Sequence, residues 1–142
     1  MSEQMNQEVR AQVERTMHAF VSMDLEGFKA GLAEDVVSFE MDMESKPVRL
    51  GSCDDVVRWA DDTFAQLKTM GAILELVIHS IDCHANSTMA YGTVEFDLKA
   101  TMAGGSTMSQ PSRNTVVLRK YGDGWKWVHW HSSLAIPAAP SA

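Results

Sequence analysis

The sequence has little of what marks several large classes of protein. Only two of its 142 residues are cysteines, Cys53 and Cys83, and they stand thirty positions apart with no CxxC pattern. We therefore expect two reduced, buried thiols rather than a disulfide framework. The polar segment MSEQMNQEVRAQVER at the N-terminus lacks the apolar stretch of a secretion signal, which favours a cytoplasmic location.

Long apolar runs and positive charge are also scarce. No run approaches the roughly 18 apolar residues needed to cross a bilayer, so we expect no membrane association through a spanning helix. Lysine and arginine number 12 against 19 acidic residues, which gives a net charge of −7. Nucleic acids and anionic membranes bind basic surfaces, so the expected partner is instead a neutral small molecule or another protein.

Sequence signatures of common catalytic machinery are missing as well. There is no GxSxG nucleophile motif, no GxGxxG and no phosphate-binding loop. Cys53 stands at the start of an expected helix without an evident base. We therefore expect neither a nucleophilic mechanism nor a nucleotide cofactor, and no cofactor is assigned.

The first part of the chain has helical periodicity. Apolar residues recur at spacings of three and four from Glu8 to about Ala33, with a break at SMDLEGF, where Asp24 can cap a second short helix that begins at Leu25. A further helix is predicted for residues 52–71. Ser52 is its expected N-cap, and Gly71 its expected end.

Elsewhere the pattern alternates with a period of two. DVVSFEMDM places Val36, Ser38, Glu40 and Asp42 on one face of a strand and Val37, Phe39, Met41 and Met43 on the other. Four further strands are expected at residues 73–81, 88–102, 108–121 and 125–136, and PVRLG is a short extended piece. The order of elements predicts an α+β fold in one domain, residues 1–136, followed by a disordered tail, residues 137–142.

The segment WKWVHWHSS concentrates aromatic and histidine residues. Strict alternation places Trp125, Trp127, His129 and His131 on one face, and Val128, Trp130 and Ser132 on the other. A zinc site would need a third ligand beside His129 and His131, and nothing in the sequence places His79 or His84 there. We therefore interpret the histidines as structural and assign no metal site.

A family resemblance rests on this segment and on the N-terminal half. LEGFKAGLAEDVVSFE and SRNTVVLRKYGDGWKWVHWHSS resemble the SnoaL-like branch of the nuclear transport factor 2-like superfamily. The resemblance implies a cone-like, curved antiparallel sheet with a mixed edge, wrapped around the N-terminal and middle helices and enclosing an apolar pocket.

The C-terminal run from Ala103 to Ser133 is also similar to the association (hub) domain of calcium/calmodulin-dependent kinase II. Three arginines that line the cavity of that domain match Phe96, Val116 and Ser132, so an anionic ligand is not implied. The match of Ser132 implies a concave face with Val128 and Trp130. Trp125, Trp127 and the two histidines would then lie on the convex face, which in this superfamily commonly packs against a second subunit, so a homodimer is expected.

Residues 13–40 are similar to the ketosteroid isomerases, whose catalytic base matches Glu40 and whose donor tyrosine matches Thr16. This resemblance implies that Glu40 takes a proton, that Ser132 or Thr16 donates to the substrate oxygen, and that the pocket excludes water. An alternative is that Glu40 lies at the mouth in water or pairs with Arg49. The apolar residues expected to contact a small apolar ligand are Phe20, Trp59, Phe96, Val116 and Trp130.

Two functions therefore remain open at this point. One is a cofactor-free acid/base enzyme, an isomerase, cyclase or dehydratase acting on an apolar carbonyl compound. The other is a non-catalytic ligand-binding or oligomerisation module that resembles the kinase association domain. The scaffold alone does not decide between them, because one fold hosts unrelated functions.

Overall fold

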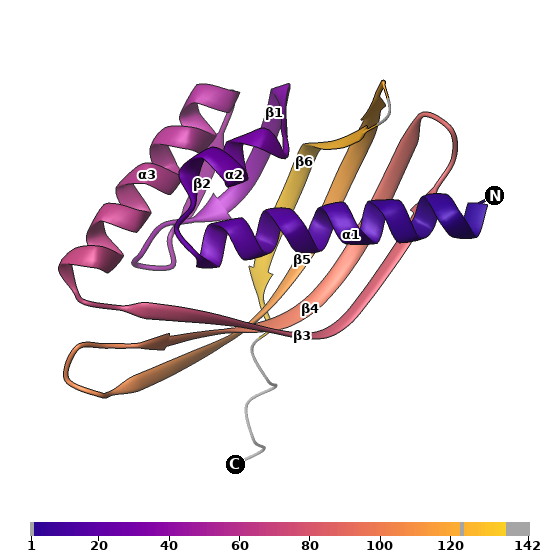
Figure 1. Ribbon diagram of the computed structural model, residues 1–142. Coiled ribbons are helices and arrows are strands. Elements are labelled where there is room, and N and C mark those ends of the chain that lie inside the picture. Colours follow the sequence, from indigo (N-terminus) through magenta and orange to yellow (C-terminus); the bar gives the residue numbers. More distant parts are fainter. Residues whose placement is uncertain (1, 123, 136–142) are drawn as a thin grey trace, which may run out of the picture.

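The computed structural model describes residues 2–122 and 124–135 and has the predicted order of helices and strands (Figure 1). The predicted tail, residues 137–142, lies outside the described residues, as does the boundary at residue 136. The helices are α1 (Ser2–Val21), α2 (Leu25–Ala30) and α3 (Cys53–Thr69); the strands are β1 (Leu32–Met41), β2 (Pro47–Leu50), β3 (Ile73–Ala85), β4 (Met89–Thr101), β5 (Thr107–Tyr121) and β6 (Gly124–Leu134).

The predicted ends of the helices are confirmed. The Asp24 side chain accepts a hydrogen bond of 3.0 Å from the backbone N–H of Gly27 and so caps α2. The Ser52 hydroxyl accepts one of 3.1 Å from the backbone N–H of Asp55 at the start of α3. Gly71 follows α3 with a φ of +64°, a left-handed conformation that glycine adopts without strain.

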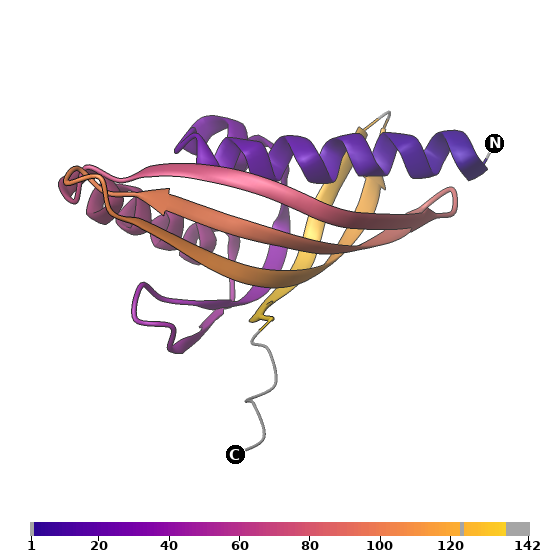
Figure 2. The same cartoon turned by 90° about the horizontal axis from the view of Figure 1, so that it is seen from below.

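The strands form one mixed, open sheet in the order β2-β1-β6-β5-β4-β3. Neighbouring strands are antiparallel except for β1 and β6, which run parallel. The sheet is strongly curved, and α1 lies across its concave side while α3 packs near β1 and β2 (Figures 1 and 2). The predicted α+β architecture of a curved sheet wrapped around helices is therefore confirmed.

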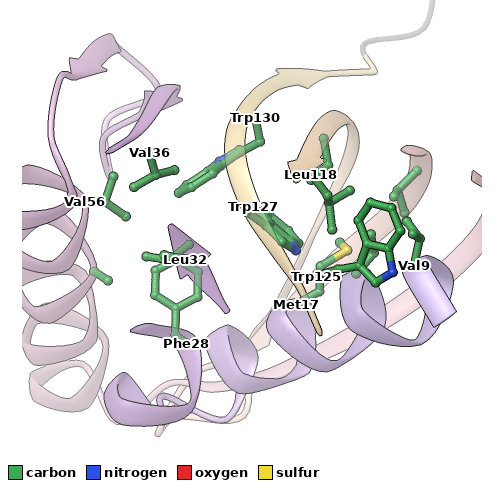
Figure 3. Packing of buried hydrophobic residues seen from close by; sticks show 14 of the residues in the cluster. Val9, Met17, Phe28, Leu32, Val36, Val56, Leu118, Trp125, Trp127 and Trp130 are labelled. Carbon is green, nitrogen blue, oxygen red and sulfur yellow. The ribbon is translucent and has the colours of Figure 1, made fainter. Parts of the chain in front are cut away.

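The core lies between these helices and the concave face of the sheet (Figure 3). Val9 and Val13 of α1 and Val56 of α3 are fully buried in it. At the end of α2, the carbonyl of Gly31 accepts a hydrogen bond of 2.8 Å from the backbone N–H of Trp127. A Cβ atom on Gly31 would lie 2.2 Å from Thr16 Oγ1, so glycine allows this close approach of α1 to the end of α2.

A β-bulge in β6 corrects the predicted faces of WKWVHWHSS. Val117 pairs with His129, but the next residue of β5, Leu118, pairs with Trp127, so Val128 is an extra residue without a partner. A bulge of this kind reverses the alternation of side chains on one side of it. Trp127 and Trp130, three positions apart, therefore point to the same face, with ring centroids 5.4 Å apart.

The prediction that Trp125 and Trp127 lie on the convex face is therefore wrong. Both are core residues, 5% and 2% exposed, and Figure 3 shows Trp125 beside Met17 and Val9. His129 and His131 do lie on the convex face, where their rings stand 5.4 and 5.6 Å from that of Phe39. The apolar stripe expected on that face is thus much smaller than the sequence suggested.

The bulge leads to a test of stability. Trp127→Ala removes a buried indole and should lower the free energy of unfolding by about 3–5 kcal/mol. Lys126→Ala, which alters the adjacent exposed residue, should change it by no more than about 0.5 kcal/mol. Chemical denaturation of both variants measures the difference. Equal, small effects would mean that Trp127 is not in the core.

Candidate functional site

A cavity of about 370 Å³ lies between the helices and the concave face of the sheet. This volume is within the range of sites that bind small molecules. Aromatic side chains and methionines dominate the cavity wall, so its surface is mainly apolar and adaptable in shape. These residues are Phe20, Phe28, Trp59, Phe96, Trp127, Trp130, Met17, Met41, Met43, Met70, Met102 and Met108.

Strand register places a polar cluster in this apolar wall. Phe39 pairs with His131, which brings Glu40 of β1 beside Ser132 of β6, and Ser132 pairs directly with Asn114 of β5. The same row continues with aliphatic residues at both ends. It runs across the sheet as Val48, Glu40, Ser132, Asn114, Val94 and Ile81.

The Glu40 carboxyl has three hydrogen-bond partners. Trp130 Nε1 lies 2.7 Å and Ser132 Oγ 2.8 Å from Oε2. The backbone N–H of Met41 donates to Oε1 over 3.2 Å. Ser132 Oγ is in addition 2.6 Å from Asn114 Oδ1. The carboxyl is thereby held in one orientation at the cavity wall.

Burial raises the pKa of the Glu40 carboxyl above its ordinary value, because the charged form loses its hydration inside the apolar wall. The hydrogen bonds from Trp130, Ser132 and Met41 act in the opposite direction, since they favour the carboxylate, but they do not cancel the effect of burial on the pKa. A carboxyl with a raised pKa is a better proton acceptor when it is ionised.

The alternative pairing of Glu40 with Arg49 does not occur. Arg49 is exposed and pairs with Phe39, on the opposite face of the sheet from Glu40. Asp42 also lines the cavity, but its Oδ1 accepts from the backbone N–H groups of Glu44 and Lys46, at 2.8 and 2.9 Å. Asp42 therefore holds the β1–β2 turn and makes no hydrogen bond with Glu40.

Six of the eight residues assigned from the sequence line the cavity together. Thr16 and Val116 do not, which corrects their predicted positions. Thr16 is buried against the end of α2, where its Oγ1 lies 3.4 Å from Gln12 Nε2. Val116 is fully buried in the core, in register with Gly92 and Trp130. The six that line the cavity are Phe20, Glu40, Trp59, Phe96, Trp130 and Ser132.

Asn114 is a polar cavity residue that the sequence analysis did not assign, and it is the one in contact with Ser132. It is 8% exposed and lines the cavity beside Ser132. A signal for it was present, because alternation along β5 puts Asn114 on the same face as Val116, which had been assigned to the cavity. Its side-chain amide can donate a hydrogen bond, and the neutral amide keeps this capacity at any ordinary pH.

Neither a metal site nor a membrane span emerges in residues 2–122 and 124–135. No three histidine, cysteine, aspartate or glutamate side chains of this part gather as a ligand set. His129 contacts the carbonyl of Val37 through Nδ1, at 2.7 Å, and His79 lies 3.0 Å from Asp97. None of the described helices is both long and apolar enough to cross a membrane.

The chain belongs to the SnoaL-like domain family, whose model matches residues 9–137. No curated protein is significantly similar to it in sequence.

Solved structures of nuclear transport factor 2-like proteins share the fold, at identities too low to transfer a function. A candidate dehydratase of this family from Streptomyces avermitilis has a TM-score of 0.80 at 14% identity, over 96% of this chain and 100% of that one. A ketosteroid isomerase-like protein from Erwinia carotovora has a TM-score of 0.69 at 16% identity, over 93% of this chain and 97% of that one. A candidate calcium/calmodulin-dependent protein kinase II association domain from Xanthomonas campestris has a TM-score of 0.72 at 18% identity, over 93% of this chain and 88% of that one.

The raised pKa of Glu40 predicts how stability depends on pH. The folded state binds the carboxyl proton more tightly than the unfolded state, so this group favours folding at low pH, and that contribution is lost as pH rises through the folded pKa. At pH 8, the Tm of Glu40→Gln should therefore be higher than that of the unsubstituted protein. Near pH 4, the two Tm values should be close to each other.

Differential scanning calorimetry across this pH range measures the effect. Glu44→Gln is the matched control, since Glu44 is exposed in the β1–β2 turn and pairs only with Lys46 on the surface. The opposite result would be a variant whose Tm, relative to that of the unsubstituted protein, is lower at pH 8 than at pH 4. It would mean that the folded state favours the ionised form of Glu40.

Proposed function

We propose that this protein binds a small apolar carbonyl compound and catalyses cofactor-free proton transfer on it, as an isomerase, cyclase or dehydratase would. The observation that carries the proposal is a single carboxyl, Glu40, held by Trp130 and Ser132 in the wall of an apolar cavity. An oriented carboxylate with a raised pKa is suited to remove a proton from a carbon next to a carbonyl group.

The charge of the cavity supports a neutral substrate. Among the residues described in its wall, Glu40 and Asp42 carry the charged side chains, and none is a lysine, arginine or histidine. An anionic ligand would meet no compensating charge there, and burying it unpaired would be unfavourable. The cavity therefore does not suit an anion, and its mainly apolar wall favours a largely apolar ligand.

Each group would have a distinct part in the reaction. The Glu40 carboxylate takes the proton; the C–H bond breaks and its electron pair moves toward the carbonyl oxygen. Phe20 and Trp59, stacked with ring centroids 5.3 Å apart, exclude water from the cavity. Asn114, rather than Thr16, is the amide placed to donate to the developing negative charge on oxygen.

Two of the structures with this fold support the class of reaction, through the names they carry. One is called a dehydratase candidate and the other a ketosteroid isomerase-like protein. Isomerisation of a ketosteroid and dehydration of a β-hydroxy carbonyl compound can both proceed through removal of a proton next to the carbonyl group. The cytoplasmic location expected from the sequence fits such an enzyme and remains a prediction.

Hydrogen–deuterium exchange tests the activity without knowledge of the natural substrate. The protein should accelerate loss of the α-proton signals of an apolar ketone, such as 1-tetralone or 2-acetylnaphthalene, in deuterium oxide followed by NMR. Glu40→Gln should lower the protein-dependent rate by about 100-fold or more. His131→Ala, on the convex face, should retain it. Binding without exchange for a series of such ketones would favour the non-catalytic ligand-binding alternative.

The second candidate function is assembly through the convex face. Phe39 is 43% exposed there, between His129 and His131, and such an aromatic group is suited to contact a second copy of the chain. We therefore propose a homodimer whose contact is centred on Phe39 and does not include Trp125 and Trp127, which lie in the core.

Sedimentation at micromolar concentration tests the homodimer. The unsubstituted protein should have twice the mass of one chain, and Phe39→Glu should shift it to the monomer, because two like charges would meet at the symmetric contact. Lys46→Glu, in the exposed β1–β2 turn, is the control for added charge. A monomer for the unsubstituted protein would contradict the proposal.

A further inference from the structure

Ser132 stands between two acceptors in the row that crosses the cavity wall. Its Oγ lies 2.8 Å from Glu40 Oε2 and 2.6 Å from Asn114 Oδ1. A serine hydroxyl has one hydrogen and can donate only one of these two bonds. The other bond must be donated to Ser132 by Glu40 or by Asn114. The orientation of each of the three side chains therefore depends on which of them carries the donated hydrogen.

The direction of the hydrogen bonds follows from the charge of Glu40. When Glu40 is ionised it can only accept, so Ser132 donates to it and Asn114 must turn its Nδ2 toward the Ser132 oxygen. When Glu40 is protonated, its Oε2–H donates to Ser132, and Ser132 donates to Asn114 Oδ1. Oε2 is favoured over Oε1 for this proton, because Oε2 can donate to Ser132 Oγ while it still accepts from Trp130 Nε1, whereas Oε1 faces only the N–H of Met41.

We propose that Ser132 and Asn114 form a relay that reverses when Glu40 gains a proton and thereby turns the Asn114 amide. Ser132 is a positioning residue in this relay, and Asn114 changes the group that it presents to the cavity. With Glu40 ionised, the cavity meets the Asn114 carbonyl oxygen. With Glu40 protonated, it meets the Asn114 N–H groups.

The surroundings leave the relay few other partners. Val48 lies beyond Glu40, and Val94 and Ile81 lie beyond Asn114, so aliphatic side chains close both ends of the row. Within the described residues, Asn114 Nδ2 makes no hydrogen bond of its own in the observed orientation. Among the described residues of the cavity wall, Asp42 is the one other charged group, and its Oδ1 accepts from backbone N–H groups of its turn.

The inference rests on the proposed function and specifies its substrate class. Transfer of a proton from carbon to Glu40 converts a neutral carbonyl compound and a carboxylate into an enolate and a carboxylic acid. Once Glu40 is protonated, the relay presents the Asn114 N–H groups to the cavity. They are then available as donors at the stage of the reaction in which the enolate oxygen is negative. Stabilisation that appears only along the reaction path accelerates it, whereas equal binding of the substrate does not. The substrate class is therefore an enolisable, uncharged ketone, aldehyde or ester.

A matched pair of ligands tests the relay. 2-Acetylnaphthalene and 2-ethylnaphthalene have nearly the same shape, but only the first has a carbonyl oxygen. Quenching of tryptophan fluorescence, from Trp59, Trp127 and Trp130 in the cavity wall, gives Kd for each. The ratio of the two Kd values measures the hydrogen bond to the carbonyl group separately from apolar contact.

In the unsubstituted protein, the preference for the ketone should rise roughly three- to tenfold as pH falls through the Glu40 pKa, as expected for one hydrogen bond. Glu40→Gln/Trp130→Phe imitates the protonated acid, since the glutamine amide can donate to Ser132 once the Trp130 Nε1–H, which faces the same position, is removed. This double variant should show the higher preference at every pH, and adding Ser132→Ala or Asn114→Leu to it should abolish that gain. Adding Ser133→Ala, the exposed neighbour on the opposite face, should leave it unchanged.

The outcomes distinguish failure of the relay from failure of the proposed function. A Glu40→Gln/Trp130→Phe/Ser132→Ala variant that keeps the full preference for the ketone would overturn the relay, because Ser132 would then not determine the orientation of Asn114. If neither naphthalene bound to any variant, the apolar-ligand function itself would fail, and the relay with it.

Discussion

The constraint on which this structure depends is the placement of a carboxyl group in an apolar wall. An unpaired buried carboxylate would destabilise the fold, so Glu40 requires donors that the backbone of its own strand supplies only in part. β6 supplies the rest with Trp130 and Ser132. The parallel pairing of β1 and β6 also places Ser38 beside Trp130, and the Ser38 hydroxyl donates a hydrogen bond to the carbonyl of Trp130. The strand that carries the aromatic motif is thus positioned by polar contacts as well as by hydrophobic burial.

Most of the elements could be predicted from the sequence because their signals are local. The caps Asp24 and Ser52, the stop at Gly71 and the period-two segments each depend on residues within a few positions of one another. The face of each tryptophan in WKWVHWHSS could not be predicted in the same way. It depends on Val128 being unpaired, which is a property of the register between β5 and β6 and leaves no mark in the residues of β6 alone.

In the candidate site, too, some features could be predicted from local sequence and others depend on how the strands pair. Glu40 and Ser132 were found through resemblance to families with known cavities, and alternation along single strands gave their faces. Alternation along β5 indicates the face of Asn114, but its contact with Ser132, the neighbour of Glu40, depends on the pairing between β5 and β6. Thr16 had been assigned by its match to a tyrosine, but its shorter side chain is occupied at the contact between α1 and Gly31. A matched position therefore did not guarantee a shared environment.

The parallel β1–β6 pair also has a consequence for how the chain folds. Ser38 and Trp130, joined by one hydrogen bond, are 92 residues apart, so this contact closes a loop that includes most of the chain. Contacts of such long range form slowly, because the entropy of the loop is lost before the contact compensates for it. While the ribosome is still synthesising β6, Glu40 has neither Trp130 nor Ser132 beside it and is an ordinary hydrated acid. The unusual chemistry of this carboxyl therefore arises only after the whole domain has been made, and no shorter nascent fragment can have it.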